Sequence, residues 1–147
     1  TQELLFWTDR LASASDQHVV TTDDGTAGRK GLVTEPLREL LEQDGGKSIQ
    51  CVYAIGPAVM MKFCAHATRP FGVKTIVSLN TVMVDGTGMC GGCRVNLNGQ
   101  IKFTCVDGPE FDGHLVDWDL VLARQKIYHE QEACSLNRYL KESEQAR

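Results

Sequence analysis

The sequence has few of the features that mark a membrane protein or a nucleic-acid-binding protein. It contains no apolar run close to the roughly eighteen residues needed to cross a bilayer. Its first residues, TQELLFWTDRL, have neither the basic start nor the apolar core of a signal peptide. Lysine and arginine are not in excess, since 15 of them face 19 Asp and Glu and give a net charge of −4. We therefore expect a cytoplasmic protein that binds neither nucleic acid nor a membrane.

What the sequence does contain suits a globular domain of ordinary size. Its 147 residues are 42% apolar and 23% charged, which is enough to bury a core without crosslinks. In a reducing compartment, its six cysteines are more often metal ligands or catalytic groups than disulfide partners. Cys51, Cys64 and Cys134 lie in a predicted strand and two predicted helices, where we expect small buried side chains rather than ligands.

Residues 1–80 alternate between helical and extended patterns. We expect three helices, over 3–14, over the residues between Thr34 and 44–48, and over 57–70. Thr34 would be the N-cap of the second helix, and residues 44–48 would end it. We expect strands over 18–24, 49–56 and 74–80. The last two runs are apolar on both sides, which is typical of buried strands in a parallel sheet. The pattern predicts an α/β fold, with residues 1–80 forming part of a doubly wound parallel-sheet nucleotide-binding domain.

The pattern changes at residue 81. Residues 81–115 are rich in Gly and Cys and contain two short alternating runs, RVNLN and IKFTCV. Asn98-Gly99 joins the two runs, and this dipeptide is typical of a β-hairpin turn. Residues 116–147 have a helical pattern with a mostly charged outer face, so we expect a C-terminal helical segment there. Trp118, Ile127 and Tyr128 in this segment either dock a partner or pack on their own domain.

Three cysteines in residues 81–115 match the spacing of a plant-type iron–sulfur site. The template C-x4-C-x2-C with a distant fourth Cys takes Cys90 and Cys93 as its close pair and Cys105 as the last ligand. Its first position then falls on Asp85. A carboxylate is anionic like a thiolate and can ligate iron, although oxygen is harder than sulfur. The surrounding glycines suit a loop that wraps closely around cluster sulfides.

Two other interpretations of this motif stay open. The CGGC at 90–93 could be a redox dithiol, although such motifs usually open a helix next to a strand. A structural zinc ion held by the three cysteines together with Asp85, His66 or His114 is also chemically reasonable. The zinc interpretation predicts a different function, a zinc-stabilised interaction module without redox activity.

A second candidate site lies at two predicted strand ends. Ligands of a doubly wound sheet bind at the carboxyl ends of its strands, which are followed here by TTDDGTAGRKG and YAIGPAVM. Gly56 and Pro57 begin a helix whose free amides and dipole favour a phosphate. Asp24 and Gly25 occupy the loop after the first strand. Any α/β sheet needs turns at such places, so these four residues alone do not define a site.

Taken together, these motifs resemble the ferredoxin reductase-like flavoproteins. YAIGP followed by a Met-containing helix is similar to their late NAD(P)-binding motif. MVDGTGMCGGCRV and FTCVDGPEFDGHLVDWD are similar to the cluster segment of one branch. That branch is the small (alpha) subunit of NADH-dependent ferredoxin:NADP oxidoreductase, the electron-bifurcating transhydrogenase also called sulfide dehydrogenase. It is related to the electron-transfer subunit of dihydroorotate dehydrogenase.

The resemblance implies a set of cofactors. A 2Fe–2S cluster would have its ligands at Asp85, Cys90, Cys93 and Cys105. A nicotinamide site is implied too, for NAD(H) rather than NADP(H), although Arg29 and Lys30 could favour the extra phosphate of NADP. FAD would complete the set. NADH would reduce FAD, and single electrons would then pass through the cluster to a larger flavin and iron–sulfur subunit, and to ferredoxin through that complex. We expect no residue of this chain to act as acid, base or nucleophile.

The sequence departs from the family in its first half. Nothing corresponds to the FAD-binding β-barrel, to the Gly-rich first strand–helix unit, or to the strand before ELLFWTDRL. The missing strands of the sheet would lie between 18–24 and 49–56, so we expect a gap in the sheet there. We therefore expect this sequence to be the C-terminal portion of a longer oxidoreductase subunit, inactive by itself, with most of the FAD site outside it.

Overall fold

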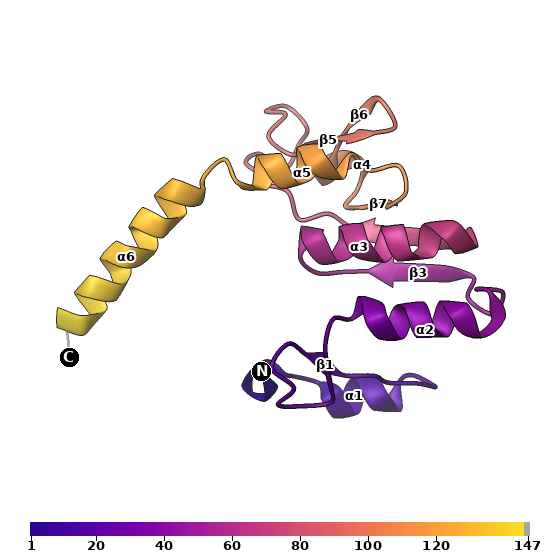
Figure 1. Ribbon diagram of the computed structural model, residues 1–147. Helices are drawn as coiled ribbons and strands as arrows, with labels where there is room; N and C mark the ends of the chain where they lie inside the picture. The colour runs from indigo at the N-terminus through magenta and orange to yellow at the C-terminus, as the bar shows by residue number, and fades with distance from the viewer. Residues whose placement is uncertain (146–147) are drawn as a thin grey trace.

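A computed structural model describes residues 1–145 (Figure 1). Its helices are η1 (Gln2–Leu4), α1 (Thr8–Ser13), α2 (Thr34–Asp44), α3 (Ala58–Thr68), η2 (Arg69–Phe71), α4 (Thr104–Asp107), α5 (Trp118–Gln125) and α6 (His129–Gln145). Its strands are β1 (Thr21–Thr22), β2 (Arg29–Lys30), β3 (Cys51–Ala54), β4 (Lys74–Ser78), β5 (Arg94–Leu97), β6 (Gln100–Phe103) and β7 (Glu110–Asp112). Within residues 1–145, no helix combines the length and the apolar character needed to cross a membrane.

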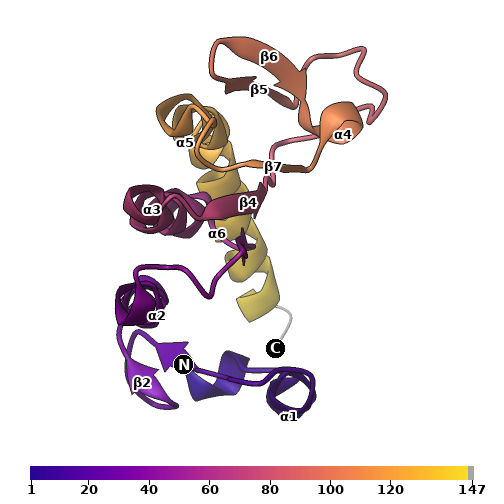
Figure 2. The same ribbon diagram turned by 90° about the vertical axis from the view of Figure 1, so that its right-hand side faces the viewer.

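The central sheet has three strands in the order β3-β4-β7. β3 and β4 are parallel, with Val52 opposite Thr75, whereas β7 is antiparallel to β4, with Phe111 opposite Val77. The α/β character is thus confirmed, but the sheet is mixed because β7 returns from the Cys-rich residues 81–115. In Figure 2, α2, α3 and α5 lie on the same side of this sheet. Residues 1–145 therefore do not form a doubly wound sheet with helices on both faces.

The expected gap in the sheet is confirmed. The strand expected over 18–24 is reduced to β1, which pairs in parallel with β2 in a separate two-stranded sheet. β3 is consequently an edge strand, and the prediction that 49–56 is buried on both sides is wrong. Tyr53 is 67% exposed because it alternates with the buried Ala54 and lies on the face of the sheet opposite to α3. β4 lies between two strands, and its Val77 is completely buried, as expected.

The helices before residue 80 follow the predictions with differences at their starts. α3 begins after Pro57, as expected, and α2 ends at Gly45, whose left-handed φ of 70° stops the helix. Thr34 is the first residue of α2 rather than its N-cap, and no side chain caps this helix. The helix expected over 3–14 is split into η1 and α1, and its apolar side chains are exposed, including Leu11.

The predicted hairpin of the Cys-rich residues is confirmed. β5 and β6 pair antiparallel, and the turn residues Asn98 and Gly99 both have positive φ, as a tight two-residue turn requires. The second strand ends earlier than expected, at Phe103, because the Asp107 carboxylate accepts a hydrogen bond from the Phe103 amide at 2.7 Å and turns the chain into α4. Cys105 therefore lies on a short helix rather than on the hairpin.

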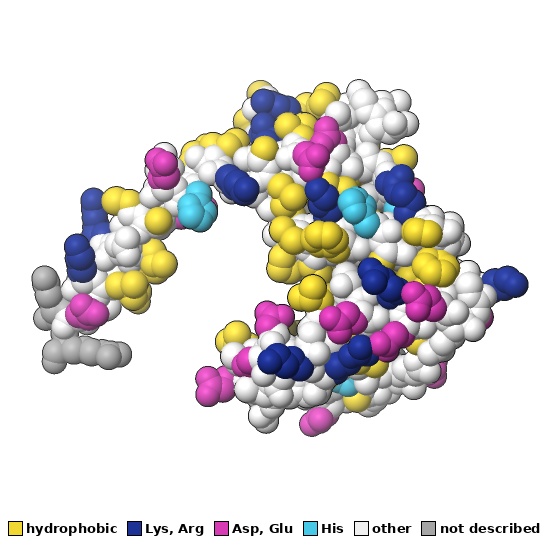
Figure 3. Space-filling model, in the orientation of Figure 1, with side chains coloured by type: hydrophobic (Ala, Val, Ile, Leu, Met, Phe, Trp, Pro, Cys, Tyr) yellow, Lys and Arg dark blue, Asp and Glu magenta, His cyan; other side chains and the backbone are white. Residues whose placement is uncertain are grey.

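The C-terminal segment is helical, as expected, but forms two helices. Asp117 caps α5 by accepting the Leu120 amide at 3.0 Å. Trp118 packs into its own domain, 5% exposed, with its Nε1 donating to the Gly113 carbonyl. Trp118 is therefore not available to dock a partner, whereas Ile127 and Tyr128 between the helices are exposed. α6 extends away from the rest of the molecule across a hollow (Figures 1 and 3).

The core lies between the central sheet, α3 and α5. Its most deeply buried members include Met61, Ala65, Val77, Leu79 and Val95. Cys64 belongs to this core, as predicted, and Cys51 is half-buried. Cys134 is exposed on α6, so the prediction that it is buried is wrong. The helical pattern around Cys134 belongs to a helix that leaves the domain.

Candidate functional site

The loop between β4 and β5, residues 79–93, carries most of the candidate metal ligands. It has no regular secondary structure, and the last turn of α5 holds it near both ends. Arg124 Nη2 donates to the Gly92 carbonyl at 2.8 Å, and Gln125 Nε2 donates to Asn80 Oδ1 at 3.0 Å. The loop is therefore fixed to a helix that is itself anchored in the core.

Asp85 organises the outer part of this loop. Its two carboxylate oxygens accept the backbone amides of Thr87 at 3.0 Å and Cys90 at 2.7 Å. These bonds lower the pKa of Asp85, so its carboxyl is anionic at neutral pH. Local bonds of this kind are also what a turn-forming aspartate makes. The structure thus places Asp85 directly against the backbone of Cys90 and shows a turn role for it.

Cys93 and Cys105 are in direct contact. The Sγ atoms of Cys93 and Cys105 are hydrogen-bonded at 3.2 Å, and the Cys105 amide donates to Cys93 Sγ at 3.5 Å. Thr104 fixes this arrangement, since its amide and hydroxyl both donate to the Cys93 carbonyl, at 3.1 and 2.9 Å. Cys93 is only 2% exposed, whereas Cys105 is half-buried. Packing and hydrogen bonds therefore bring together two cysteines that are far apart in the sequence.

The two thiols have opposite pKa shifts. Burial would raise the pKa of Cys93, but the hydrogen bonds from the amide and thiol of Cys105 outweigh it, and this pKa is lowered. The pKa of Cys105 is raised, first by the hydrogen bond that its thiol donates to Cys93, and also by burial and by the negative charges of Cys93 and Asp85. Cys93 is therefore the thiol of the pair that ionises more easily, and the charge of Asp85 disfavours ionisation of Cys105.

The four predicted ligands form two pairs. Asp85 is hydrogen-bonded to the backbone of Cys90, and Cys93 contacts Cys105. Cys90 is exposed, and its Sγ accepts the Gly92 amide at 3.3 Å. Within residues 1–145, no three His, Cys, Asp or Glu side chains lie close enough together to hold a single metal ion.

Gly88 shows why this loop needs glycine. Its φ is 82°, and an added Cβ would lie 3.0 Å from Cγ2 of Val106 on α4. The Gly88 amide also donates to the Cys105 thiol and opposes the rise of its pKa. A side chain at this position would separate the loop from α4, which carries Cys105.

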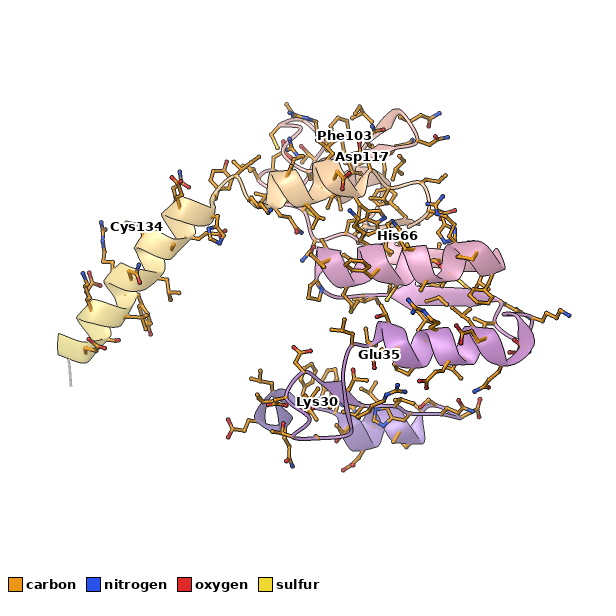
Figure 4. All side chains as sticks on the ribbon, viewed as in Figure 1. Lys30, Glu35, His66, Phe103, Asp117 and Cys134 are labelled. Atoms are coloured by element: carbon orange, nitrogen blue, oxygen red, sulfur yellow. The ribbon has the colours of Figure 1, made fainter. Side chains whose placement is uncertain are left out.

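The histidines of the zinc interpretation lie elsewhere. His114 Nε2 is 3.0 Å from Thr68 Oγ1 at the junction of α3 and β7. His66 is exposed on α3, where its ring lies edge-on to Phe63 (Figure 4). Figure 4 also shows Cys134 on α6, well away from Phe103 at the end of β6. Neither histidine joins the described cysteines in a group that could hold one ion.

Pro57, one of the four predicted nucleotide residues, lines a cavity, whereas Asp24, Gly25 and Gly56 are not among its lining residues. This cavity of about 430 Å³ lies between the end of β1 and the start of α3, and Asp23 and Pro57 both line it. Its wall is mostly apolar, with contributions from Leu32, Val33, Val59, Met60 and Phe63. Pro57 lines the cavity, and the neighbouring Gly56 leads into α3, whose N-terminus has no side-chain cap.

The other predicted nucleotide residues are held in local contacts. Gly25 lies in the loop after β1, with a φ of 74°, and the Asp24 carboxylate bonds both the amide and the hydroxyl of Thr26. Arg29 is paired with two glutamates of α2, at 2.6 Å to Glu39 and 3.5 Å to Glu35. Its guanidinium is therefore not free for a phosphate in this conformation.

The structure reveals a set of residues around the Cys-rich loop that the sequence did not single out. They are Thr104, Asp107, Arg124 and Gln125. Thr104 and Asp107 are close to Cys105 in the sequence, so their hydrogen bonds are local and a sequence pattern could have indicated them. Arg124 acts on a residue 32 positions away, for which no local sequence pattern exists.

Comparison with known proteins identifies the type of domain around these residues. Residues 80–117 match the iron–sulfur cluster binding domain of dihydroorotate dehydrogenase B. Residues 80–117 are therefore similar to an iron–sulfur cluster binding domain. The matched range contains all four predicted metal ligands and the contact between Cys93 and Cys105.

Relatives and a solved structure extend this similarity over nearly the whole chain. A homolog of the electron transfer subunit of dihydroorotate dehydrogenase B (NAD(+)) from Thermotoga maritima is 51% identical over 141 residues, which cover 96% of this chain and 49% of the relative. A probable subunit of the same kind from Methanopyrus kandleri is 39% identical over 103 residues, 70% of this chain and 37% of that protein. The chain thus spans about half, or less, of the length of the curated relatives it matches.

The solved structure is that of an NADH-dependent reduced ferredoxin-NADP oxidoreductase, studied for flavin-based electron bifurcation. It is 51% identical, with a TM-score of 0.75, and the match covers 90% of this chain and 46% of that one. This similarity agrees with the resemblance seen in the sequence motifs.

Proposed function

We propose that this chain is the cluster-bearing part of the electron-transfer subunit of a flavin-dependent NAD(P)H oxidoreductase. One observation carries the proposal: Cys93 and Cys105 have their sulfurs 3.2 Å apart within the range that matches an iron–sulfur cluster binding domain. The chain itself supplies ligands and positions them, and the bound cofactors supply the chemistry.

The residues present fit a 2Fe–2S cluster. Each iron of such a cluster takes two protein ligands, and we assign Asp85 and Cys90 to one iron and Cys93 and Cys105 to the other. Two sulfurs bound tetrahedrally to one metal at about 2.3 Å stand about 3.8 Å apart, so the Cys93–Cys105 pair has to open by only about half an ångström. When bound, a cluster of this type takes up and releases single electrons.

The two ligand pairs differ in burial, so the proposed site has one buried side and one exposed side. Cys93 is buried against the core, whereas Asp85 and Cys90 are exposed. The exposed pair therefore leaves one side of the site open to a redox partner, and the buried pair holds the site rigidly to β5 and α4.

The zinc alternative requires all four donors around one ion. The described donors stand in two pairs, and His66 and His114 are engaged at other places in the fold. No specific observation favours a zinc module over the cluster.

We further propose a nicotinamide site at the cavity between β1 and α3, which Pro57 lines, with Gly56 next to Pro57 and with Asp24 and Gly25 in the loop after β1. The cavity and the uncapped start of α3 support this assignment. The relatives carry NAD(+) or NADP in their names. FAD and a larger flavin and iron–sulfur subunit would complete the electron path, with ferredoxin reached through that complex. Most of the FAD site would lie outside these residues.

Asp85 provides the sharpest test of the ligand set. Asp85→Cys should still assemble a cluster, because a thiolate restores the all-Cys pattern, but its reduction potential and EPR signal should change with the ligand. Asp85→Ala should lose most of the iron, because one iron is left with an open position. Iron analysis and EPR of the dithionite-reduced protein measure both effects.

The matched control is Asp44→Ala. Asp44 also accepts two backbone amides, those of Lys47 at 3.1 Å and Ser48 at 2.8 Å, so this variant removes local hydrogen bonds of the same kind at the end of α2 rather than in the Cys-rich residues. It should keep its iron and its EPR signal. If Asp85→Ala also keeps full iron and an unchanged EPR signal, Asp85 is a turn residue only and the assignment is wrong.

A further inference from the structure

We propose that Arg124 is a positioning residue for the turn between Cys90 and Cys93, and that its positive charge raises the reduction potential of the cluster. This inference rests on the proposed function, because it requires a cluster at these cysteines. Arg124 lies outside the range that matches the iron–sulfur domain, which ends at residue 117.

Arg124 contacts the loop from α5, a helix that is packed against the core. It lies in the last turn of α5, and its Nη2 donates to the Gly92 carbonyl at 2.8 Å. Val121 and Trp118, one and two turns earlier, are buried in the core, and Asp117 caps the start of the helix. The position of the guanidinium is therefore set by the core rather than by the loop it contacts.

The Gly92 peptide links this contact to a proposed ligand. Its amide donates to Cys90 Sγ at 3.3 Å, while its carbonyl, on the peptide that leads into Cys93, accepts from Arg124. Arg94 adds a second guanidinium, with Nη1 donating to the Gly91 carbonyl at 3.1 Å. Both glycine carbonyls of the turn are thus held by cations. A hydrogen bond to a carbonyl polarises its own peptide group, so the bond from Arg94 strengthens donation from the Gly92 amide to Cys90 Sγ, whereas Arg124 holds the next peptide, which leads into Cys93.

The positive charge of Arg124 shifts the equilibrium between the oxidised and the reduced cluster. Its side chain is half-buried, and within residues 1–145 it has no carboxylate in ion-pair contact. A positive charge near a cluster with four anionic ligands favours the state that carries one more electron, because reduction adds a negative charge. Lys has the same charge at this position, whereas Gln keeps hydrogen-bonding capacity without it.

The test uses Arg124→Gln, Arg124→Lys and the control Arg69→Gln in the reconstituted chain. Arg69 also donates to a backbone carbonyl, that of His114 at 2.6 Å, but this carbonyl belongs to the segment between β7 and α5. A potentiometric titration followed by EPR measures the ratio of reduced to oxidised cluster. Circular dichroism checks that each variant is folded, and the rate of cluster loss under chelator is measured in parallel.

We expect Arg124→Gln to lower the reduced-to-oxidised ratio at a fixed potential by about fivefold and to speed cluster loss. Arg124→Lys should restore most of the ratio, and Arg69→Gln should change neither quantity. If Arg124→Gln has the same reduced-to-oxidised ratio and the same rate of cluster loss as Arg69→Gln, the inference is wrong. A cluster in the wild-type chain would still support the proposed function in that case. A folded wild-type chain that assembles no cluster would overturn both.

Discussion

The Cys-rich residues 81–115 and the first forty residues are held in different ways. Val95, Cys93 and Phe111 of the Cys-rich residues are buried, and the first two lie beside the loop that carries Asp85 and Cys90. Residues 1–40 contain no buried apolar side chain among those described. Their large apolar residues, such as Phe6 and Leu11, are exposed, and the turn at Asp24 is held by local hydrogen bonds.

This difference separates the two candidate sites. The candidate metal ligands are positioned by packing against α4 and α5, which fixes them to the same core as β4 and α3. The candidate nucleotide residues Asp24 and Gly25 are positioned by their own turn, and only the start of α3 on the other side of the cavity rests on the core. The metal site can therefore be tested with residues 1–145 alone, whereas the nucleotide site requires the complete subunit.

The largest effect should come from removing a buried ligand. Cys93→Ala should reduce bound iron and sulfide by at least about tenfold, because it removes one ligand and the sulfur that is hydrogen-bonded to the thiol and to the amide of Cys105. Iron and acid-labile sulfide analysis measure this. Cys134→Ala, an exposed cysteine on α6, is the matched control and should keep its iron. Equal iron in the two variants would contradict the proposed site.

The difference in packing predicts a second, smaller effect on stability. Met61→Ala, in the core under β4, should lower the free energy of unfolding by about 2–5 kcal/mol, because it leaves a cavity. Leu11→Ala on α1 should lower it by less than about 0.5 kcal/mol, because Leu11 is exposed. Urea unfolding followed by circular dichroism measures both. Similar losses in the two variants would show that residues 1–40 do pack on a core.

The smallest effect concerns an ion pair on the surface of the N-terminal region. Hydrogen bonding and charge from Arg29 lower the pKa of Glu39, so the pair stabilises the fold above the ordinary Glu pKa and loses this effect as pH falls through the lowered value. Glu39→Gln should be slightly less stable than wild type at pH 7 and equal to it once the pH is below the lowered pKa of Glu39. Urea midpoints measured from pH 7 down into acid, with Glu42→Gln as control, test this. A difference that grows in acid would contradict the assignment.

Local patterns in the sequence predicted the elements that depend on local chemistry. Asn98-Gly99 predicted the hairpin because both turn residues need positive φ. Pro57 marked the start of α3, and Gly45 marked the end of α2. The spacing of four residues selected Asp85 and the three cysteines, because ligand spacing in a loop is itself a local property.

Elements that depend on distant contacts were not predicted. β7 has only three residues and forms because Phe111 pairs with Val77 of β4, so no local pattern could reveal it. The apolar run around Tyr53 indicated a strand buried on both faces, but α2, α3 and α5 all lie on one side of the sheet and leave Tyr53 exposed on the other (Figure 2). Arg124 contacts the loop across 32 residues, and its role emerges only once α5 is placed.

The most direct test of the central claim is the metal content of the protein purified without oxygen. If Asp85, Cys90, Cys93 and Cys105 hold a 2Fe–2S cluster, the chain should contain about two iron atoms and about two acid-labile sulfides. It should be red-brown, with visible bands that dithionite bleaches. Iron and sulfide in equal amounts would support the account. A colourless protein with one zinc ion and no sulfide would contradict it.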